Sequence, residues 1–330
     1  MANRSILILP EDGAAPIARA MHAAKRSLSI KMFLFSDPQL VDEVIASRRR
    51  GIQVRVILNV SRRSGEEENQ GTRKLLEAAG IEVREGNPEF GLTHEKSMLV
   101  DDTWAFIQSM NWDTKNLTQT RDYAITTSYP REVNELMSCF EADWSRQKFD
   151  PGQRSGLIWC PGNGREKVAR FIDQANHNLV LQNERFQDAV IIERLVHAAL
   201  RGVKVHIMTK APHTLKKEKL LEGVSGLRLL DDVGIKIHKV RRLHGKMLLA
   251  DHARAIIGSI NLAPGSFDDR RELAIEVSDE AIVRRLKKTA HLDWKNSSVM
   301  DLTDHGLMAD LKDRAEELDP GLRRNELAQG

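Results

Sequence analysis

The chain has 330 residues, of which 41% are hydrophobic and 29% charged, and its formal net charge is +3. This composition is that of an ordinary soluble globular protein with room for about two domains, and it lacks the basic excess of a dedicated duplex-binding protein. The two cysteines, Cys139 and Cys160, exclude a disulfide framework and a metal site built on cysteine pairs.

No stretch of the sequence is long and apolar enough for a transmembrane helix, and the first residues lack the apolar core of a signal peptide. We therefore expect a cytoplasmic protein that meets any lipid from outside the bilayer. Peripheral contact with the inner membrane is compatible with this expectation.

In chain order, the sequence predicts two similar α/β halves. Three stretches of the first half recur in the second: 18–30 parallels 169–181, 49–58 parallels 200–209, and 79–85 parallels 233–239. Each half reads helix, strand, helix, strand, helix, strand, then a run of strands and a closing helix. That alternation is typical of a mixed β-sheet with helices on its faces.

A polar stretch over 145–156 separates the halves, which gives predicted domains of residues 1–150 and 151–330. The stretch is short, so we expect the halves to pack closely. Beyond it, the C-terminal tail carries apolar residues at helical spacing, which predicts a helix packed on the second half. These residues are Leu307, Leu311, Ala315 and Leu318.

A second repeat keeps a fixed offset of 150 residues without a slip. "THEKSMLVDD" in the first half corresponds to "LHGKMLLADH" in the second. The repeated positions of the first half are His94, Lys96, Asp101, Ser109, Asn111, Asp122 and Trp144, and those of the second half are His244, Lys246, Asp251, Ser259, Asn261, Glu272 and Trp294. A single His-x-Lys on a strand is in most cases structural, but seven matched positions indicate a duplicated site.

On a strand, His94 and Lys96 share one face, whereas Asp101 has the opposite parity. The same relation holds in the second copy. We therefore expect Asp101 and Asp251 to support the strand ends, while the two His-Lys pairs meet across an approximate two-fold axis at the domain interface. Trp144 and Trp294 are expected to be core aromatics of the closing helices.

Two imidazoles and two ammonium groups in one cleft suit a tetrahedral phosphodiester. One neutral histidine can attack phosphorus while the other, protonated, donates to the leaving oxygen. Lys96 and Lys246 would neutralise the non-bridging oxygens. The predicted phosphate cradle is completed by backbone donors and by Ser109, Asn111, Ser259 and Asn261.

Each imidazole also needs a carboxylate that holds its other nitrogen. Asp122 and Glu272 each lie 28 residues after a histidine. This spacing predicts Asp122 as the partner of His94, and Glu272 as the partner of His244. The reaction requires no metal, and no H-E-x-x-H cluster is present.

The duplicated H-x-K-x4-D pattern, with a G/Q-S-x-N turn and a downstream acid after each copy, resembles the phospholipase D superfamily of phosphodiesterases and phosphatidyltransferases. The resemblance implies paired α/β domains in pseudo-two-fold relation, an active site at their interface, a covalent phosphohistidine and no cofactor. It also implies that His94 is the nucleophile and His244 the general acid. Gln108 stands where the family prefers glycine, so the turn of the first half is expected to differ in shape.

The substrate class stays open between two alternatives. The first is a glycerophospholipid, hydrolysed or transferred to an alcohol by a soluble enzyme similar to cardiolipin synthases. The second is DNA or RNA, cleaved by a nuclease of the same superfamily. The small net charge and the 5% aromatic content favour the lipid. A catalytically inactive binding module is disfavoured because every polar member of both motifs is present.

Overall fold

The computed structural model describes residues 3–59, 69–152, 154–211 and 220–309. The elements of the first half are β1 (Arg4–Leu9), α1 (Ala15–Ala23), β2 (Ser27–Met32), α2 (Pro38–Arg49), β3 (Gln53–Leu58), α3 (Gln70–Ala78), β4 (Glu82–Glu85), β5 (Leu92–Thr93), β6 (Ser97–Val100), β7 (Trp104–Gln108), α4 (Thr114–Gln119), β8 (Asp122–Thr127) and α5 (Pro130–Trp144). Those of the second half are β9 (Leu157–Cys160), α6 (Gly164–Asp173), β10 (Asn178–Gln182), α7 (Ala189–Leu200), β11 (Lys204–Thr209), α8 (Leu220–Asp232), β12 (Lys236–Lys239), β13 (Lys246–Ala250), β14 (Arg254–Gly258), α9 (Pro264–Asp268), β15 (Arg270–Val277), α10 (Glu280–Lys295) and β16 (Ser298–Val299).

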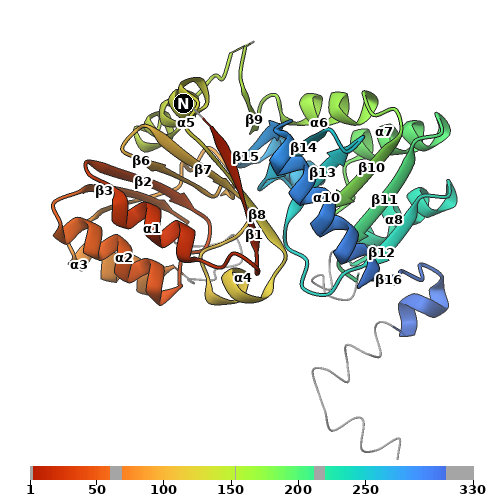
Figure 1. Ribbon diagram of the computed structural model, residues 1–330, viewed down its shortest axis with the longest axis horizontal. Helices are drawn as coiled ribbons and strands as arrows, with labels where there is room; N and C mark the ends of the chain where they lie inside the picture. Colours follow the sequence, from red (N-terminus) through yellow and green to blue (C-terminus); the bar gives the residue numbers. More distant parts are fainter. Residues whose placement is uncertain (1–2, 60–68, 153, 212–219, 310–330) are drawn as a thin grey trace, which may run out of the picture.

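The strands form two mixed sheets that lie side by side in Figure 1. The first has the order β1-β8-β7-β6-β2-β3-β4, and the second has the order β16-β12-β11-β10-β13-β14-β15-β5, with β9 also paired to β15. In each half, three strands joined by helical crossovers run parallel, and the remaining neighbours of the repeated core are antiparallel. This confirms the predicted α/β fold of two similar halves.

The predicted element order missed the first strand of each half. β1 pairs antiparallel with β8, and β9 pairs antiparallel with β15. Both strands are short and almost continuously apolar, as is common where both faces of a strand are covered, so they carry no alternation to reveal them.

Local sequence signals explain where the repeated helices begin and end. α2 and α7 are capped by Asp37 and Asp188, whose side chains accept a hydrogen bond from the backbone N–H three residues later. After each helix the chain turns through a glycine, Gly51 or Gly202, at φ 89°, a conformation that other residues rarely adopt. Equivalent helices thus start and stop by the same chemistry in both halves.

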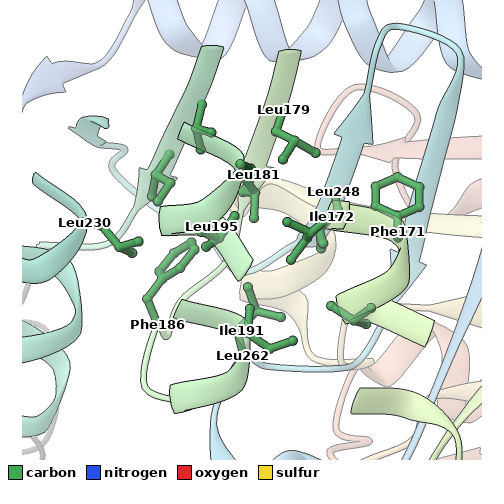
Figure 2. Close-up of a cluster of buried hydrophobic side chains, with 14 of the residues drawn as sticks. Phe171, Ile172, Leu179, Leu181, Phe186, Ile191, Leu195, Leu230, Leu248 and Leu262 are labelled. Atoms are coloured by element: carbon green, nitrogen blue, oxygen red, sulfur yellow. The ribbon is translucent and has the colours of Figure 1, made fainter. Parts of the chain in front are cut away.

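Three clusters of buried apolar side chains form the core. One lies between the first sheet and helices α1, α2 and α3, and another lies between the second sheet and helices α6, α7 and α8. Figure 2 shows the second of these, in which Phe171, Leu195 and Leu230 of three helices face Leu181 and Leu248 of the sheet. These two clusters cover the outer faces of the sheets.

The third cluster joins the two halves. It combines side chains of β1, β7, β8 and α5 with side chains of β9, β13, β14, β15 and α10. Because this apolar interior is shared, the halves pack closely, as the short connection between them predicts. β5 strengthens the connection, since it belongs to the first half but pairs with β15 of the second sheet.

The ends of the closing helices and the C-terminal tail bear on the sequence expectations. Trp144 is buried in the shared core and Trp294 is partly buried against it. Leu307 packs on the outer cluster of the second half, while Leu311, Ala315 and Leu318 lie outside the described residues. Among the described helices, none combines the length and apolar character that crossing a membrane requires.

Candidate active site

The two predicted histidines meet at the interface, and each is held by a carboxylate of the opposite half. His94 lies in the loop between β5 and β6, and its Nδ1 is 2.8 Å from Glu272 Oε2 at the start of β15. His244 directly precedes β13, and its Nδ1 is 2.8 Å from Asp122 Oδ1 at the start of β8. The backbone supports the same arrangement, because His94 N donates to Arg271 O and His244 N donates to Arg121 O.

The predicted partner assignment was therefore wrong. Asp122 holds His244 and Glu272 holds His94, the reverse of the pairing expected from the spacing within each half. The physical reason is that β8 and β15 each reach across the interface, so a carboxylate at the beginning of either strand lies nearer to the imidazole of the other half. At neither His94 nor His244 does the carboxylate that contacts Nδ1 come from the same half.

The motif lysines lie beside the histidines, although the His-x-Lys segments are loops leading into strands and not continuous strands. Lys96 Nζ donates to the His94 carbonyl at 2.6 Å, and Lys246 Nζ donates to the His244 carbonyl. Both lysine side chains are almost fully buried. Buried ammonium groups are costly unless an anion accompanies them, which is what a phosphate would supply.

Sequence reasoning missed Glu184. Its Oε2 is 2.9 Å from Lys246 Nζ and 3.9 Å from His244 Nε2, and its other oxygen bonds Lys210. The structural counterpart of Glu184 in the first half is Phe33: Phe33 is five residues after Leu28, and Glu184 is five after Leu179, and these two leucines occupy equivalent register positions.

Phe33 gives the first half a different environment. Its ring lies 4.9 Å from the His94 ring and 5.0 Å from Lys96 Nζ. Lys96 makes no ion pair with a carboxylate among the described residues, whereas Lys246 does. The two halves thus present one His-Lys pair against an aromatic ring and one against a carboxylate.

The electrostatics of the first pair follow from this environment. Burial, reinforced by Lys96 and Lys246, holds the pKa of His94 well below its ordinary value. Burial likewise holds the pKa of Lys96 well below its ordinary value, with Lys246 adding to the effect and the carboxylate of Glu272 opposing it. His94 is therefore neutral at neutral pH, with its proton on Nδ1 facing Glu272 and the Nε2 lone pair free for chemistry.

The pKa values of Glu272 and Asp122 are shifted in opposite directions. Burial raises the pKa of Glu272, against the opposing charge of Lys96. Burial would also raise the pKa of Asp122, but the charge of His244 and the hydrogen bonds outweigh it, and the pKa of Asp122 is lowered. Asp122 additionally accepts from Ser109 and Thr120, each at 2.6 Å.

The motif serines lie beside the strands that carry the carboxylates. The phosphate-binding role predicted for Ser109 and Ser259 stays a prediction, and both side chains are fully buried. The Ser109 hydroxyl donates to Asp122 and accepts from Tyr123 N at 2.8 Å, and the Ser259 hydroxyl accepts from Leu273 N at 3.1 Å. They therefore support the strands that carry the carboxylates.

Asn111 and Asn261 are buried beside the same turns, and in both halves the amide oxygen has no hydrogen-bond partner among the described residues. Gln108, which replaces glycine before the first of these turns, accepts from the indole N–H of Trp112 at 3.0 Å. At Gly258 a side chain would collide with the backbone of Leu273, so the two turns do differ.

Asp101 and Asp251 lie away from the imidazoles, in the tight turns after β6 and β13. The Asp101 carboxylate accepts backbone hydrogen bonds from Lys25, Arg26 and Ser27. The Asp251 carboxylate accepts them from the equivalent residues 176–178. Each ties a hairpin to the start of the neighbouring strand, the supporting place that strand parity suggested.

One group of potential metal ligands occurs among the described residues, formed by Glu95, Cys139 and Asp143. The Lys31 ammonium lies 2.9 Å from Glu95 and 2.6 Å from Asp143. A cation is thus already present between these carboxylates, and the group is an ion-paired cluster beneath the His94 loop.

The site thus combines two histidines, two lysines and two carboxylates on a duplicated α/β fold, and the comparisons with known proteins show the family. Residues 17–144 and 168–294 match the family described as "Cardiolipin synthase, PLD-like domain". These two segments cover more than half of the chain, which therefore belongs to this family.

Several relatives show the range of similarity. The mitochondrial cardiolipin hydrolase of Mus musculus is 32% identical over 145 residues, which cover 44% of this chain and 63% of that protein. Cardiolipin synthase B of Salmonella typhimurium is 24% identical over 329 residues, covering 82% of this chain and 75% of that protein. A polyphosphate kinase of Vibrio parahaemolyticus is 23% identical, and the match covers 89% of this chain but 44% of the kinase. The chain thus spans less than two thirds of the mouse hydrolase and of the kinase.

Among solved structures, phosphatidylserine synthase of Haemophilus influenzae superposes with a TM-score of 0.73 at 11% identity, covering 97% of this chain and 94% of that chain. The TM-score shows a shared fold, and at this identity the likeness shows the fold alone.

Proposed function

We propose that this protein is a phosphodiesterase or phosphatidyltransferase that acts on glycerophospholipids through a phosphohistidine on His94. The observation that carries the proposal is the crossed arrangement of the two imidazoles, each held at Nδ1 by a carboxylate of the other half. In this arrangement both Nε2 atoms are left for chemistry on one phosphorus.

The proposed reaction has two steps. The Nε2 lone pair of His94 forms a bond to phosphorus while the bond from phosphorus to the leaving oxygen breaks, and His244 Nε2 gives its proton to that oxygen. Water or an alcohol then attacks phosphorus, His244 takes its proton, and the nitrogen–phosphorus bond breaks. Lys96 and Lys246 stabilise the charge on the non-bridging oxygens in both steps.

The division of roles is supported by the environments of the histidines. Phe33 and the nearby cations favour a neutral imidazole at His94, which suits a nucleophile. His244 lies between the carboxylates of Asp122 and Glu184, which suits the residue that carries a proton to the leaving group.

A lipid substrate is supported by a pocket of about 800 Å³ next to this site. Arg270, which lines it, is two residues before Glu272, and its charge acts on His94. The apolar walls of the pocket include Ile192, Ala263 and Pro264, and the lining also contains a second cation, Arg185, and one carboxylate, Glu193. A cationic and apolar pocket of this size can hold the glycerol backbone and part of an acyl chain. The names of the cardiolipin-related relatives point the same way.

The test is incubation with phosphatidylglycerol vesicles and ethanol, followed by mass spectrometry of the lipids. We expect phosphatidylethanol and phosphatidic acid, with turnover persisting in a chelator. Cleavage of DNA, RNA or polyphosphate without lipid turnover would contradict the proposal.

The nucleophile is tested by intact-protein mass spectrometry. His244→Ala should accumulate a phosphatidyl adduct because the second step lacks its base, whereas His94→Ala should form none. His197→Ala, an exposed histidine of α7, is the matched control and should behave as the unaltered protein. An adduct in His94→Ala that is absent from His244→Ala would exchange the two roles.

A further inference from the structure

A second pocket of about 760 Å³ lies on the second half, between helix α10 and the face of the sheet formed by β10, β11 and β13. In Figure 1, α10 crosses in front of these strands. The pocket is reached from Asn178 and Lys204, at the beginnings of β10 and β11, whereas the active site is at the opposite ends of β10 and β13. It is therefore separate from the site described above.

The floor of this pocket is largely apolar. Val180 and Leu249 contribute from the sheet, Ala290 and Trp294 contribute from α10, and His206 lies beside Val180 with its ring against Trp294. Leu249 and Ala290 are almost fully buried, so the floor reaches the core. An apolar floor in a cavity this large favours a ligand with an apolar body.

The rim is cationic. Four basic side chains, Lys204, Arg284, Lys287 and Lys288, surround the opening, and no lining residue is acidic. Arg284 pairs with Glu280 of its own helix, while the three lysines form no ion pair with any described residue. Burial together with the charge of Lys287 lowers the pKa of His252, another lining residue, which reflects the crowding of positive charge here. Such a rim favours an anionic ligand.

The equivalent volume of the first half is filled. There, Arg55 lies 5.1 Å from the Phe140 ring and 5.3 Å from the Trp144 ring, and its guanidinium pairs with Glu141. Each of these side chains except the tryptophan is replaced in the second half. His206 stands for Arg55, Ala290 for Phe140, and His291 for Glu141, as the strand registers and the 150-residue repeat show.

The comparison within one chain is informative because the fold is the same in both halves. The second half loses a large ring, a long side chain and the carboxylate that pairs with Arg55, and it keeps the tryptophan wall. These three replacements make the opening larger than its counterpart. The opening is also more positive, because Lys287 and Lys288 stand where the first half has Met137 and Ser138.

We infer that this pocket binds one anionic phospholipid, whose phosphate contacts the lysine rim and whose apolar part lies on Val180, Leu249, Ala290 and Trp294. A free phosphate would meet only the rim, and a zwitterionic lipid would bring a cation against it. The inference does not depend on the chemistry at His94, since the pocket is elsewhere in the molecule.

The test is titration calorimetry in the His94→Ala background, which prevents turnover. The probes are short-chain dihexanoyl phosphatidic acid, dihexanoyl phosphatidylcholine and inorganic phosphate. We expect phosphatidic acid to bind at two sites, one in the active site and one in the pocket. Ala290→Phe restores the ring of the first half and should remove the second site.

The lysine rim provides an independent variant. Lys287→Glu with Lys288→Glu changes exposed positions and should weaken the pocket site by at least about tenfold. The control is Arg49→Glu with Lys74→Glu, an equal charge change at exposed positions of α2 and α3, and it should leave both sites unchanged. The thermal midpoint of each variant reports its folding.

Three results would overturn the inference: binding of phosphatidic acid that Ala290→Phe leaves unchanged, binding that keeps its full strength in the lysine variant, or inorganic phosphate that binds the pocket as tightly as phosphatidic acid. The last result would identify a phosphate site without a lipid. Lipid turnover by the unaltered protein is measured separately, so a failure of this inference is distinct from a failure of the proposed reaction.

Discussion

At the scale of single residues, the two His-Lys pairs are chemically different because Phe33 and Glu184 occupy the same place in the two halves. Glu184 contacts Lys246 and approaches the Nε2 atom of His244. In the proposed reaction His244 gives a proton to the leaving oxygen and takes one back in the second step. The negative charge of Glu184 favours the protonated imidazole that this role requires.

Glu184→Gln should therefore slow the turnover of substrates with a poor leaving group. We expect kcat to fall by about 10–100-fold for an alkyl leaving group, which needs general acid catalysis, and by much less for p-nitrophenol, which does not. Glu166→Gln, an exposed glutamate of α6, is the control. An equal loss for both leaving groups would show that Glu184 supports the fold and not the proton transfer.

The pH dependence is a second prediction at this scale. The pKa of His94 lies below its ordinary value of about 6.5, so the neutral nucleophile persists to lower pH, and kcat/KM should remain near its maximum at about pH 6. The pKa of Lys96 is also lowered, so its ammonium group loses its charge at a pH below the ordinary range for lysine. Activity should therefore fall on the alkaline side of the profile.

A full pH profile of kcat/KM measures both limbs. Lys96→Arg keeps a charge that does not titrate and should move the alkaline limb to higher pH, provided the variant remains active. An acid limb centred near pH 7 would contradict the neutral state inferred for His94.

At the scale of secondary-structure elements, Asp101 holds the hairpin after β6 to the start of β2. Its carboxylate accepts three backbone N–H groups, and its φ of 53° lies in the left-handed region. Asp101→Ala should lower the free energy of unfolding by about 1–3 kcal/mol, because these donors lose their acceptor. Chemical denaturation measures the change, and the acid limb of the kcat/KM profile should not move.

Asp102 provides a matched control. It has nearly the same backbone conformation, φ 55°, but its carboxylate accepts no hydrogen bond from the described residues. Asp102→Ala therefore reports the backbone strain alone. If the two alanine variants lose equal stability, the carboxylate of Asp101 contributes nothing.

The repeat predicted most of the elements and the histidines and lysines that meet at the interface, and its limits have physical causes. A fixed offset identifies which residues are equivalent, so His94, Lys96 and their counterparts were found. It does not tell whether a carboxylate serves its own half or the other half, because both arrangements have the same spacing. The crossed pairing depends on how β8 and β15 cross the interface, which is a tertiary property.

Glu184 was missed for a different reason. It corresponds to Phe33, so the two halves share no residue type at this position, and the alignment there has slipped by one residue. The signal that could have revealed it is the pair of helix caps, Asp37 and Asp188, each four residues after the position in question.

At the scale of the whole molecule, two ion pairs bind the halves together next to Asp122 and Glu272. Arg271, which precedes Glu272, bonds Asp143 of α5 at 3.0 and 3.1 Å. Arg121, which precedes Asp122, bonds Asp293 of α10 at 2.8 and 2.9 Å. Each strand that delivers a carboxylate across the interface is thus fixed by the residue before it.

The first of these pairs is the more buried. Arg271 and Asp143 are each about 3% exposed, and they join Lys31 and Glu95 in a cluster of two cations and two anions. Removing one member leaves an unpaired charge in a place that water cannot reach, whereas removing a cation and an anion together leaves the cluster neutral.

Arg271→Met should therefore cost about 3–5 kcal/mol of unfolding free energy, while Arg271→Met combined with Asp143→Leu should recover much of that loss. Urea denaturation measures both values. Arg170→Met, in an exposed pair on α6, is the control and should change the unfolding free energy little.

The Arg271–Asp143 pair should also matter for catalysis, because without it the start of β15 is less firmly held and Glu272 no longer fixes His94. The double variant should thus regain stability but stay impaired in forming the phosphatidyl adduct. Full recovery of both properties would mean that the shared apolar core alone positions β15.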